Sequence, residues 1–137
     1  MAMRPGIKKK WLAALRSGTY MQGRGKLRPT PKTYCCLGVL LDLYRRSAEG
    51  RRAKARWVRD KDDNVFRFVA KKGRFTTQTG GVLHRCAVQW AGLPSHDPSV
   101  SVTLDGQDVS LSMLNDGCKR IRKHSFAQIA KVIEEQL

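Results

Sequence analysis

The sequence predicts a single α+β domain over residues 1–137, in which three to four helices pack with short antiparallel β-hairpins. Several segments carry apolar residues at helical spacing, whereas others alternate apolar and polar residues as half-buried strands do. The length is typical of one domain. Hydrophobic residues make up 41% of the chain, which is enough to form a core.

The first predicted helix covers residues 7–17. Its apolar face consists of Ile7, Trp11, Leu12 and Leu15, which recur at the spacing of helical turns. Glycines and prolines then punctuate a turn-rich connection, with a short extended piece expected near its middle.

The second predicted helix covers residues 34–46 and is expected to be central to the core. Leu37, Leu40, Leu41 and Tyr44 lie at positions i, i+3, i+4 and i+7, and neighbouring apolar residues widen this stripe. A mobile basic loop is expected to follow this helix, around Gly50.

Two strands at 57–59 and 65–69 are predicted to form a hairpin, joined by the polar turn 61–64. A third helix is expected at 82–90, after a pair of glycines. A second hairpin is expected from the alternating segment 100–104, through a turn at Asp105-Gly106, into residues 109–111.

A short helical turn is predicted at 111–116, and a last helix at 125–137. The last helix has the clearest local signal, because Ser125 and Gln128 have the spacing of a capping box. No internal repeat or low-complexity tract interrupts this organisation.

The charge is strongly asymmetric along the chain. Lys and Arg total 27 against 11 Asp and Glu, giving a net charge of +16, and the whole excess lies within residues 1–74. Such a field attracts polyanions over about a Debye length, roughly 10 Å at 0.1 M salt. The composition therefore favours a polyanionic partner, with DNA preferred over RNA and no sequence specificity expected.

The predicted contacts with nucleic acid come from three basic segments. The first choice is the stretch after the second helix, supported by a lysine run near the N-terminus and a basic cluster after the second strand. These residues are Arg45, Arg46, Arg51, Arg52, Lys54, Arg56, Arg59, Lys8, Lys9, Lys10, Lys71, Lys72 and Arg74.

Aromatic residues alternate with arginines in the same region, which suggests that bases stack beside the phosphate contacts. These aromatics are Trp57, Phe66, Phe68 and Phe75. The alternative is that strand alternation turns them into the core. A helix-turn-helix is not expected from the last helix, because no second helix follows it in the chain.

No catalytic residue, metal site or cofactor is predicted. The four cysteines, Cys35, Cys36, Cys86 and Cys118, lack C-x-x-C spacing and are expected to be buried free thiols. The three histidines are scattered. Asp62-Asp63 fits turn chemistry better than metal binding.

The segment from Trp11 to Tyr20 resembles the opening of a group of small bacteriophage-encoded proteins. The group continues with a Y/F-C-C-L-G-V-L motif, here Tyr34–Leu40, and a W-A-G-L segment, here Trp90–Leu93. An L-N-D turn, here Leu114–Asp116, and a helix like Ser125–Ala130 complete the resemblance.

The resemblance implies a phage accessory protein that acts in the cytoplasm of an infected bacterium. It supplies no activity that transfers to particular residues, and this chain departs from the group in its basic stretch from Arg45 to Arg74. The alternative function is inhibition of a bacterial host protein, which would bind through the same basic face. No membrane partner is expected, because the longest apolar run, 34–41, is too short to span a bilayer. Oligomeric state is left open.

Overall fold

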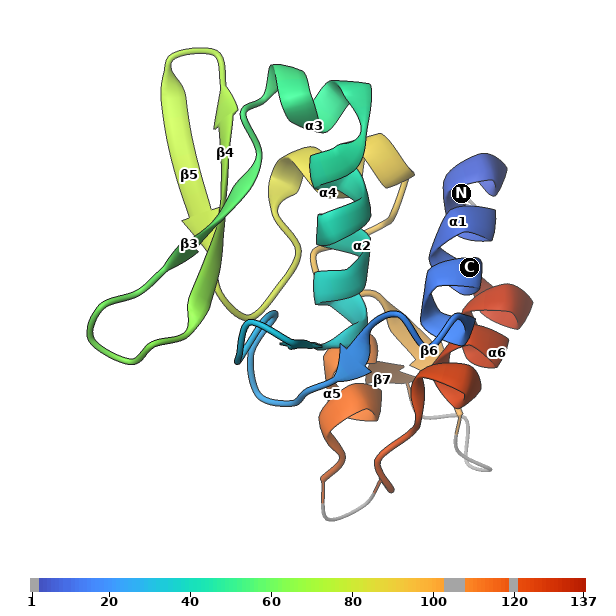
Figure 1. Ribbon diagram of the computed structural model, residues 1–137. Helices are drawn as coiled ribbons and strands as arrows, with labels where there is room; N and C mark the ends of the chain where they lie inside the picture. Colours follow the sequence, from blue (N-terminus) through green and yellow to red (C-terminus); the bar gives the residue numbers. More distant parts are fainter. Residues whose placement is uncertain (1–2, 103–107, 119–120) are drawn as a thin grey trace.

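The computed structural model describes residues 3–102, 108–118 and 121–137, and places α2 (Cys36–Arg46) at the centre of an α+β domain. The antiparallel pair α1 (Pro5–Arg16) and α6 (Phe126–Gln136) lies on one side of α2, and a three-stranded sheet lies on the other (Figure 1). Leu37, Leu40 and Leu41 are fully buried. The predicted central helix is therefore confirmed.

The three-stranded sheet is antiparallel with the order β3-β4-β5. Its strands are β3 (Arg56–Arg59), β4 (Phe66–Lys72) and β5 (Phe75–Thr79). The predicted hairpin corresponds to β3 and β4. Strand β5 was missed, because its residues are mostly exposed and lack apolar alternation.

Two smaller strand pairs complete the β structure of the described residues. A parallel pair joins β1 (Met21–Gln22) to β2 (Thr33–Tyr34). The predicted second hairpin is confirmed as the antiparallel pair β6 (Ser99–Ser101) and β7 (Asp108–Ser110). Its expected turn at Asp105-Gly106 lies outside the described residues.

The described residues form six helices, rather than three to four. Besides α1, α2 and α6 they include α3 (Ala48–Arg52), α4 (Arg85–Ala91) and α5 (Leu111–Asp116). Helix α4 begins three residues later than predicted, because His84 caps it by accepting from the Cys86 amide. The capping box of Ser125 and Gln128 at α6 is present as predicted.

The segment around Gly50 is the main error of the sequence analysis. It was expected to be a mobile basic loop, but Ser47 caps a short helix, α3, there. Gly50 is buried, and a Cβ at this position would collide with the Tyr44 carbonyl. The glycine therefore allows α3 to pack closely against the end of α2.

Asn115 in α5 connects three segments of the core. Its Oδ1 accepts from the Cys36 amide at 3.1 Å, and its Nδ2 donates to the Gly23 carbonyl at 2.7 Å. The cysteines are less uniform than expected: Cys35 and Cys36 are buried, Cys86 is half-buried and Cys118 is exposed. None of the helices in the described ranges is long and apolar enough to cross a membrane.

Candidate functional site: a basic pocket around Asp42

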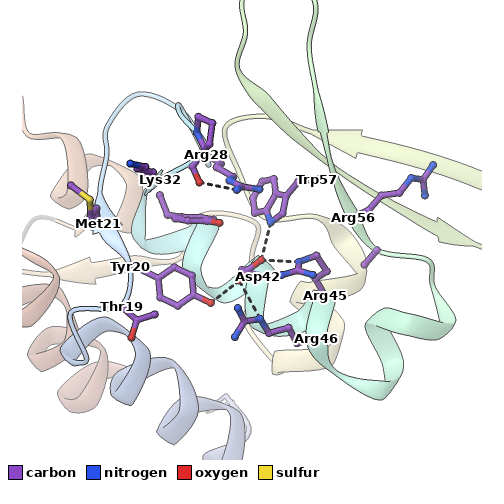
Figure 2. A pocket seen from close by; sticks show the side chains of 13 residues that line it. Thr19, Tyr20, Met21, Arg28, Lys32, Asp42, Arg45, Arg46, Arg56 and Trp57 are labelled. Atoms are coloured by element: carbon purple, nitrogen blue, oxygen red, sulfur yellow. Dashed lines mark hydrogen bonds and ion pairs between the residues drawn. The ribbon is translucent and has the colours of Figure 1, made fainter.

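A pocket of about 760 Å³ opens between α2, β3 and the segment that includes β1 and β2 (Figure 2). We call it the Asp42 pocket. It brings together five basic side chains, three aromatic rings and one carboxylate from four separate segments. The residues that line it are Thr19, Tyr20, Met21, Arg28, Pro31, Lys32, Tyr34, Asp42, Arg45, Arg46, Ala55, Arg56 and Trp57.

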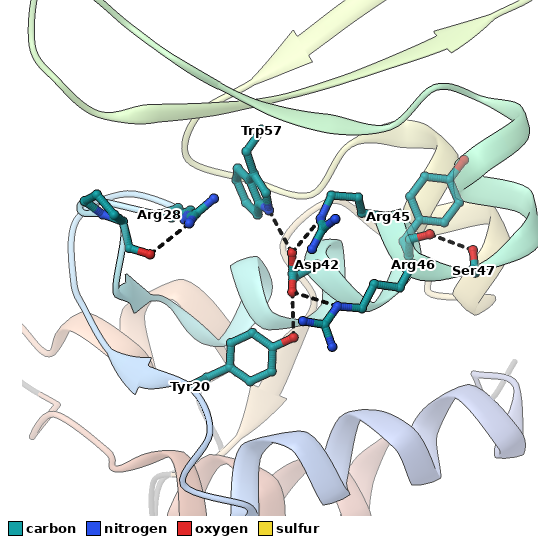
Figure 3. Close-up of polar contacts among 9 residues, drawn as sticks. Tyr20, Arg28, Asp42, Arg45, Arg46, Ser47 and Trp57 are labelled. Atoms are coloured by element: carbon teal, nitrogen blue, oxygen red, sulfur yellow. Dashed lines mark hydrogen bonds and ion pairs between the residues drawn. The ribbon is translucent and has the colours of Figure 1, made fainter.

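The Asp42 carboxylate is almost fully buried, with 2% of its side chain exposed, and it organises the pocket floor. Its Oδ1 accepts from Arg45 Nε at 2.8 Å and from Trp57 Nε1 at 3.0 Å. Its Oδ2 accepts from the Tyr20 hydroxyl at 2.6 Å and lies 3.5 Å from Arg46 Nε. Figure 3 shows these groups converging on the carboxylate from α2, β3 and the end of the loop after α1.

The network fixes the charge states of its members. Burial alone would raise the pKa of Asp42, but hydrogen bonds from Arg45, Tyr20 and Trp57 outweigh it, so that the pKa is below its usual value. Burial and the hydrogen bond to Asp42 raise the pKa of Tyr20 well above its usual value. At neutral pH the floor therefore holds an ionised carboxylate and a neutral phenol.

Arg28 covers an aromatic cluster on one side of the pocket. Its guanidinium carbon lies 4.9 Å from the centre of the Tyr34 ring, 5.7 Å from Trp57 and 4.3 Å from Phe66. These distances are within the range of cation–π attraction. The guanidinium also donates to the Pro31 carbonyl at 2.8 Å, which holds it across the rings.

Three of the predicted contact residues, Arg45, Arg46 and Arg56, line this pocket. Arg45 and Arg46 reach Asp42 because they lie three and four residues after it on the same helix. Arg56 lies at the margin, where its guanidinium donates to the Lys54 carbonyl and points away from Asp42 (Figure 2).

A second group of predicted residues gathers at one end of the molecule, near α3 and the β4–β5 turn. The Lys71 amide donates to the Ala53 carbonyl at 2.7 Å, which holds the end of β4 against the segment after α3. All members of the group are exposed: Arg51, Arg52, Lys54, Lys71, Lys72 and Arg74. Because α3 connects α2 to β3, Arg51, Arg52 and Lys54 lie in the chain between the pocket residues Arg46 and Arg56.

The remaining predicted residues lie apart from these two groups. Lys8, Lys9 and Lys10 belong to α1, where Lys8 Nζ donates to the Glu134 carbonyl on α6 at 3.0 Å. Arg59 lies at the far end of β3 from α3. The structure therefore does not bring the predicted residues into one cluster.

The predicted stacking aromatics also separate. Phe68 is fully buried, and Phe66 is half-buried beneath Arg28 and does not line the pocket, so neither ring borders the Asp42 pocket. Phe75 is 75% exposed, but it lies outside the pocket, on β5. Trp57 is the one member of the four that lines the pocket.

Sequence reasoning missed Asp42, Tyr20, Tyr34, Arg28 and Lys32. One signal was available for Asp42, since it is a single carboxylate inside an apolar helix with arginines at i+3 and i+4. The others come from a turn-rich connection whose path the sequence pattern does not specify.

A family model described as a domain of unknown function, DUF8296, matches residues 3–137, and the chain therefore belongs to this family. No curated protein and no solved structure matches the chain. The family description names no activity, so the function has to be argued from the pocket and its surroundings.

Proposed function

We propose that this protein binds nucleic acid without sequence specificity, through the Asp42 pocket and the basic surface that continues over α3 and the β4–β5 turn. The resemblance to small phage proteins supports a role as a phage accessory protein in the cytoplasm of an infected bacterium. DNA is the preferred partner in this proposal.

One observation supports the proposal above the others: two guanidinium groups are anchored by their Nε atoms to one buried carboxylate. Because Asp42 occupies the Nε positions, the terminal amino groups of Arg45 and Arg46 stay available to an anion. Arginine held in this way suits phosphate, since its fork of donors matches phosphate oxygens.

The surrounding charge supports the same partner. The pocket lining holds five basic side chains against a single carboxylate, and the adjoining α3 adds Arg51 and Arg52, both exposed. The ion pair between Arg52 and Glu49 is long, at 3.7 Å, and mostly exposed, so it neutralises little of this field.

The proposal is tested by removing four charges from this surface and four from elsewhere. The first variant replaces Arg46, Arg51, Arg52 and Arg56 with Ser. Its matched control replaces four lysines with Ser. These lysines are exposed and lie outside the pocket: Lys9, Lys10, Lys123 and Lys131. Both variants lose the same net charge.

Binding to a random-sequence duplex is then measured against salt concentration. Each lost phosphate contact lowers the slope by about 0.9, so four lost contacts lower it by up to about 3.6. We expect this change in the first variant, with a much smaller one in the control. Equal losses would mean that only net charge matters, and an absence of binding at 50 mM salt, both to this duplex and to its separated strands, would refute the proposal. Binding to one host protein through the same arginines would favour the inhibitor alternative.

A further inference from the structure

The size of the Asp42 pocket indicates which form of nucleic acid binds there, and this inference rests on the proposed function. A volume of about 760 Å³ is within the range of small-molecule sites, roughly 300–1,000 Å³. A hollow of that size accepts one nucleotide. The bases of a duplex are paired and stacked within the helix, so they cannot enter it.

The pocket wall has the composition of a stacking site rather than of a phosphate site alone. Tyr20, Tyr34 and Trp57 all line it, and each of the three residues is half-buried, so that part of its surface is accessible to solvent. The Tyr20 and Tyr34 rings meet edge to face with centroids 5.0 Å apart, and Tyr34 meets Trp57 in the same manner at 6.0 Å. Proteins that bind single strands combine such rings with a basic groove.

Three contacts hold the rings of this wall in place. The hydrogen bonds from Tyr20 and Trp57 to Asp42 fix both rings against one buried carboxylate. Arg28 holds the Tyr34 ring from the other side, and its Nε is buried without a hydrogen-bond partner among the described residues. A buried donor in that state is costly, which indicates that the position of Arg28 is set by the rings.

Cations flank the rings that line the pocket. Arg45 and Arg46 stand on the α2 side of the rings, and Figure 2 shows their guanidinium groups around Asp42, below Trp57 and beside Tyr20. Lys32 also lines the pocket, and Figure 2 shows it apart from Arg45 and Arg46, across the Tyr20 ring. A nucleotide that places its base on the tyrosine side thus meets a cation on either flank.

We propose that the Asp42 pocket holds one unpaired base of a single-stranded nucleic acid, with the neighbouring phosphate on Arg45 and Arg46. The protein then prefers single strands over duplex, and it distinguishes a strand that carries bases from one that carries phosphates alone. The basic surface over α3 and the β4–β5 turn holds the rest of the strand by charge.

The test compares three probes at one salt concentration by fluorescence anisotropy. The first is an oligothymidylate of about 12 nucleotides, a length within the site sizes of single-strand binders. The second has the same length and phosphates but abasic positions throughout, and the third is a duplex. We expect the base-bearing strand to bind about tenfold or more tightly than the abasic strand, since stacking of one base contributes that much.

Two variants locate the contact. Tyr34→Leu should bring the base-bearing and abasic strands to nearly equal affinity. Phe75→Leu, which changes an exposed ring outside the pocket, should keep the difference. If Tyr34→Leu does not fold, a strand with a fluorescent adenine analogue is bound to the unaltered protein and to Phe75→Leu, because stacking on a ring quenches the analogue. Quenching that persists in Phe75→Leu supports the pocket, whereas quenching that is absent from both proteins, or is lost in Phe75→Leu, overturns it.

The outcomes separate the two proposals. Equal binding of base-bearing, abasic and duplex probes overturns the base pocket and leaves a binder of phosphate backbones. The difference in affinity between the base-bearing and abasic strands could instead be lost in Phe75→Leu and retained in Tyr34→Leu. The base would then bind at β5, and the proposed base pocket would be overturned. An absence of binding to all three probes overturns the proposed function itself.

Discussion

Replacement of Asp42 by Ala is expected to destabilise the protein by about 3 kcal/mol. The change leaves the Tyr20 hydroxyl and the Trp57 indole without their acceptor, and it removes the partner of Arg45. Breaking a buried ion pair costs about 3–5 kcal/mol. The lower end applies because the Arg45 and Arg46 side chains are 36% and 61% exposed, so water can solvate them again.

This loss of free energy corresponds to a melting temperature lower by about 10 °C for a domain of this size. Thermal unfolding followed by circular dichroism measures it, and Asp62→Ala is the control, since Asp62 is exposed in the turn between β3 and β4. The control should melt within about 2 °C of the unaltered protein. A shift as small as this in Asp42→Ala would refute the assignment of Asp42 as the centre of the network.

The same carboxylate predicts a pH dependence with a definite sign. The pKa of Asp42 is lower in the folded protein than its ordinary value of 3.8, so the unfolded chain binds more protons as pH falls. The contribution of Asp42 is therefore complete above about pH 4–5 and is lost as pH falls through the lowered pKa. The difference in stability between the unaltered protein and Asp42→Ala should shrink in that acidic range.

The remaining predictions concern the core and one histidine. Gly38→Ala should strongly destabilise the protein, because the new Cβ would collide with the Leu27 carbonyl. Gly6→Ala has open space around its Cβ and should leave the stability unchanged or slightly higher. Urea unfolding measures the free energy of unfolding of both variants. Leu40→Ala should cost about 2–5 kcal/mol by leaving a cavity, and a melting shift below one degree would contradict this. Burial lowers the pKa of His84, so stability measured by thermal melts should fall as pH drops below about 6.5.

Helical periodicity predicted the elements that bury a continuous stripe. Helices α2 and α6 were found because their apolar residues repeat every three or four positions, and Ser125 marks the start of α6. Strand β5 lacked such a pattern, since it is an edge strand whose residues are exposed or half-buried. The two-residue pair of β1 and β2 is too short to produce any periodic signal.

Gly50 illustrates why charge misled the sequence analysis. A glycine among arginines has the composition of an exposed loop, but here the absence of a side chain permits close contact between α3 and α2. The exposure of Arg51 and Arg52 was nevertheless predicted correctly. Composition thus identified which side chains face solvent, although it did not identify the backbone that carries them.

The candidate site was only partly predictable, for a topological reason. Arg45 and Arg46 belong to a helix that the sequence reveals, so their positions followed from it. Tyr20 and Arg28 come from the connection between α1 and α2, and Trp57 comes from β3. Their convergence in the lining of the Asp42 pocket depends on tertiary packing, which a single sequence does not encode in any local pattern.

A buried carboxylate in the core helix needs an explanation beyond stability, because well-packed apolar residues often replace a buried ion pair at no net cost. Orientation of two guanidinium groups and two rings is such an explanation, and Asp42→Asn tests it by its effect on the ratio of two affinities, those for the base-bearing and the abasic strand. The variant has one more net positive charge, so attraction by charge alone predicts tighter binding of every probe at low salt.

If Asp42 instead positions the pocket, the variant frees Arg45 and Arg46 from their anchor, and Tyr20 and Trp57 lose a charged acceptor. We then expect the affinity for the abasic strand to be unchanged or higher. The ratio of the affinity for the base-bearing strand to that for the abasic strand should fall toward one. Attraction by charge alone raises both affinities and leaves their ratio unchanged, whereas positioning by Asp42 predicts a ratio that falls toward one. The ratio of the two affinities in Asp42→Asn, measured beside a thermal melt that establishes folding, decides between charge and positioning as the role of this carboxylate.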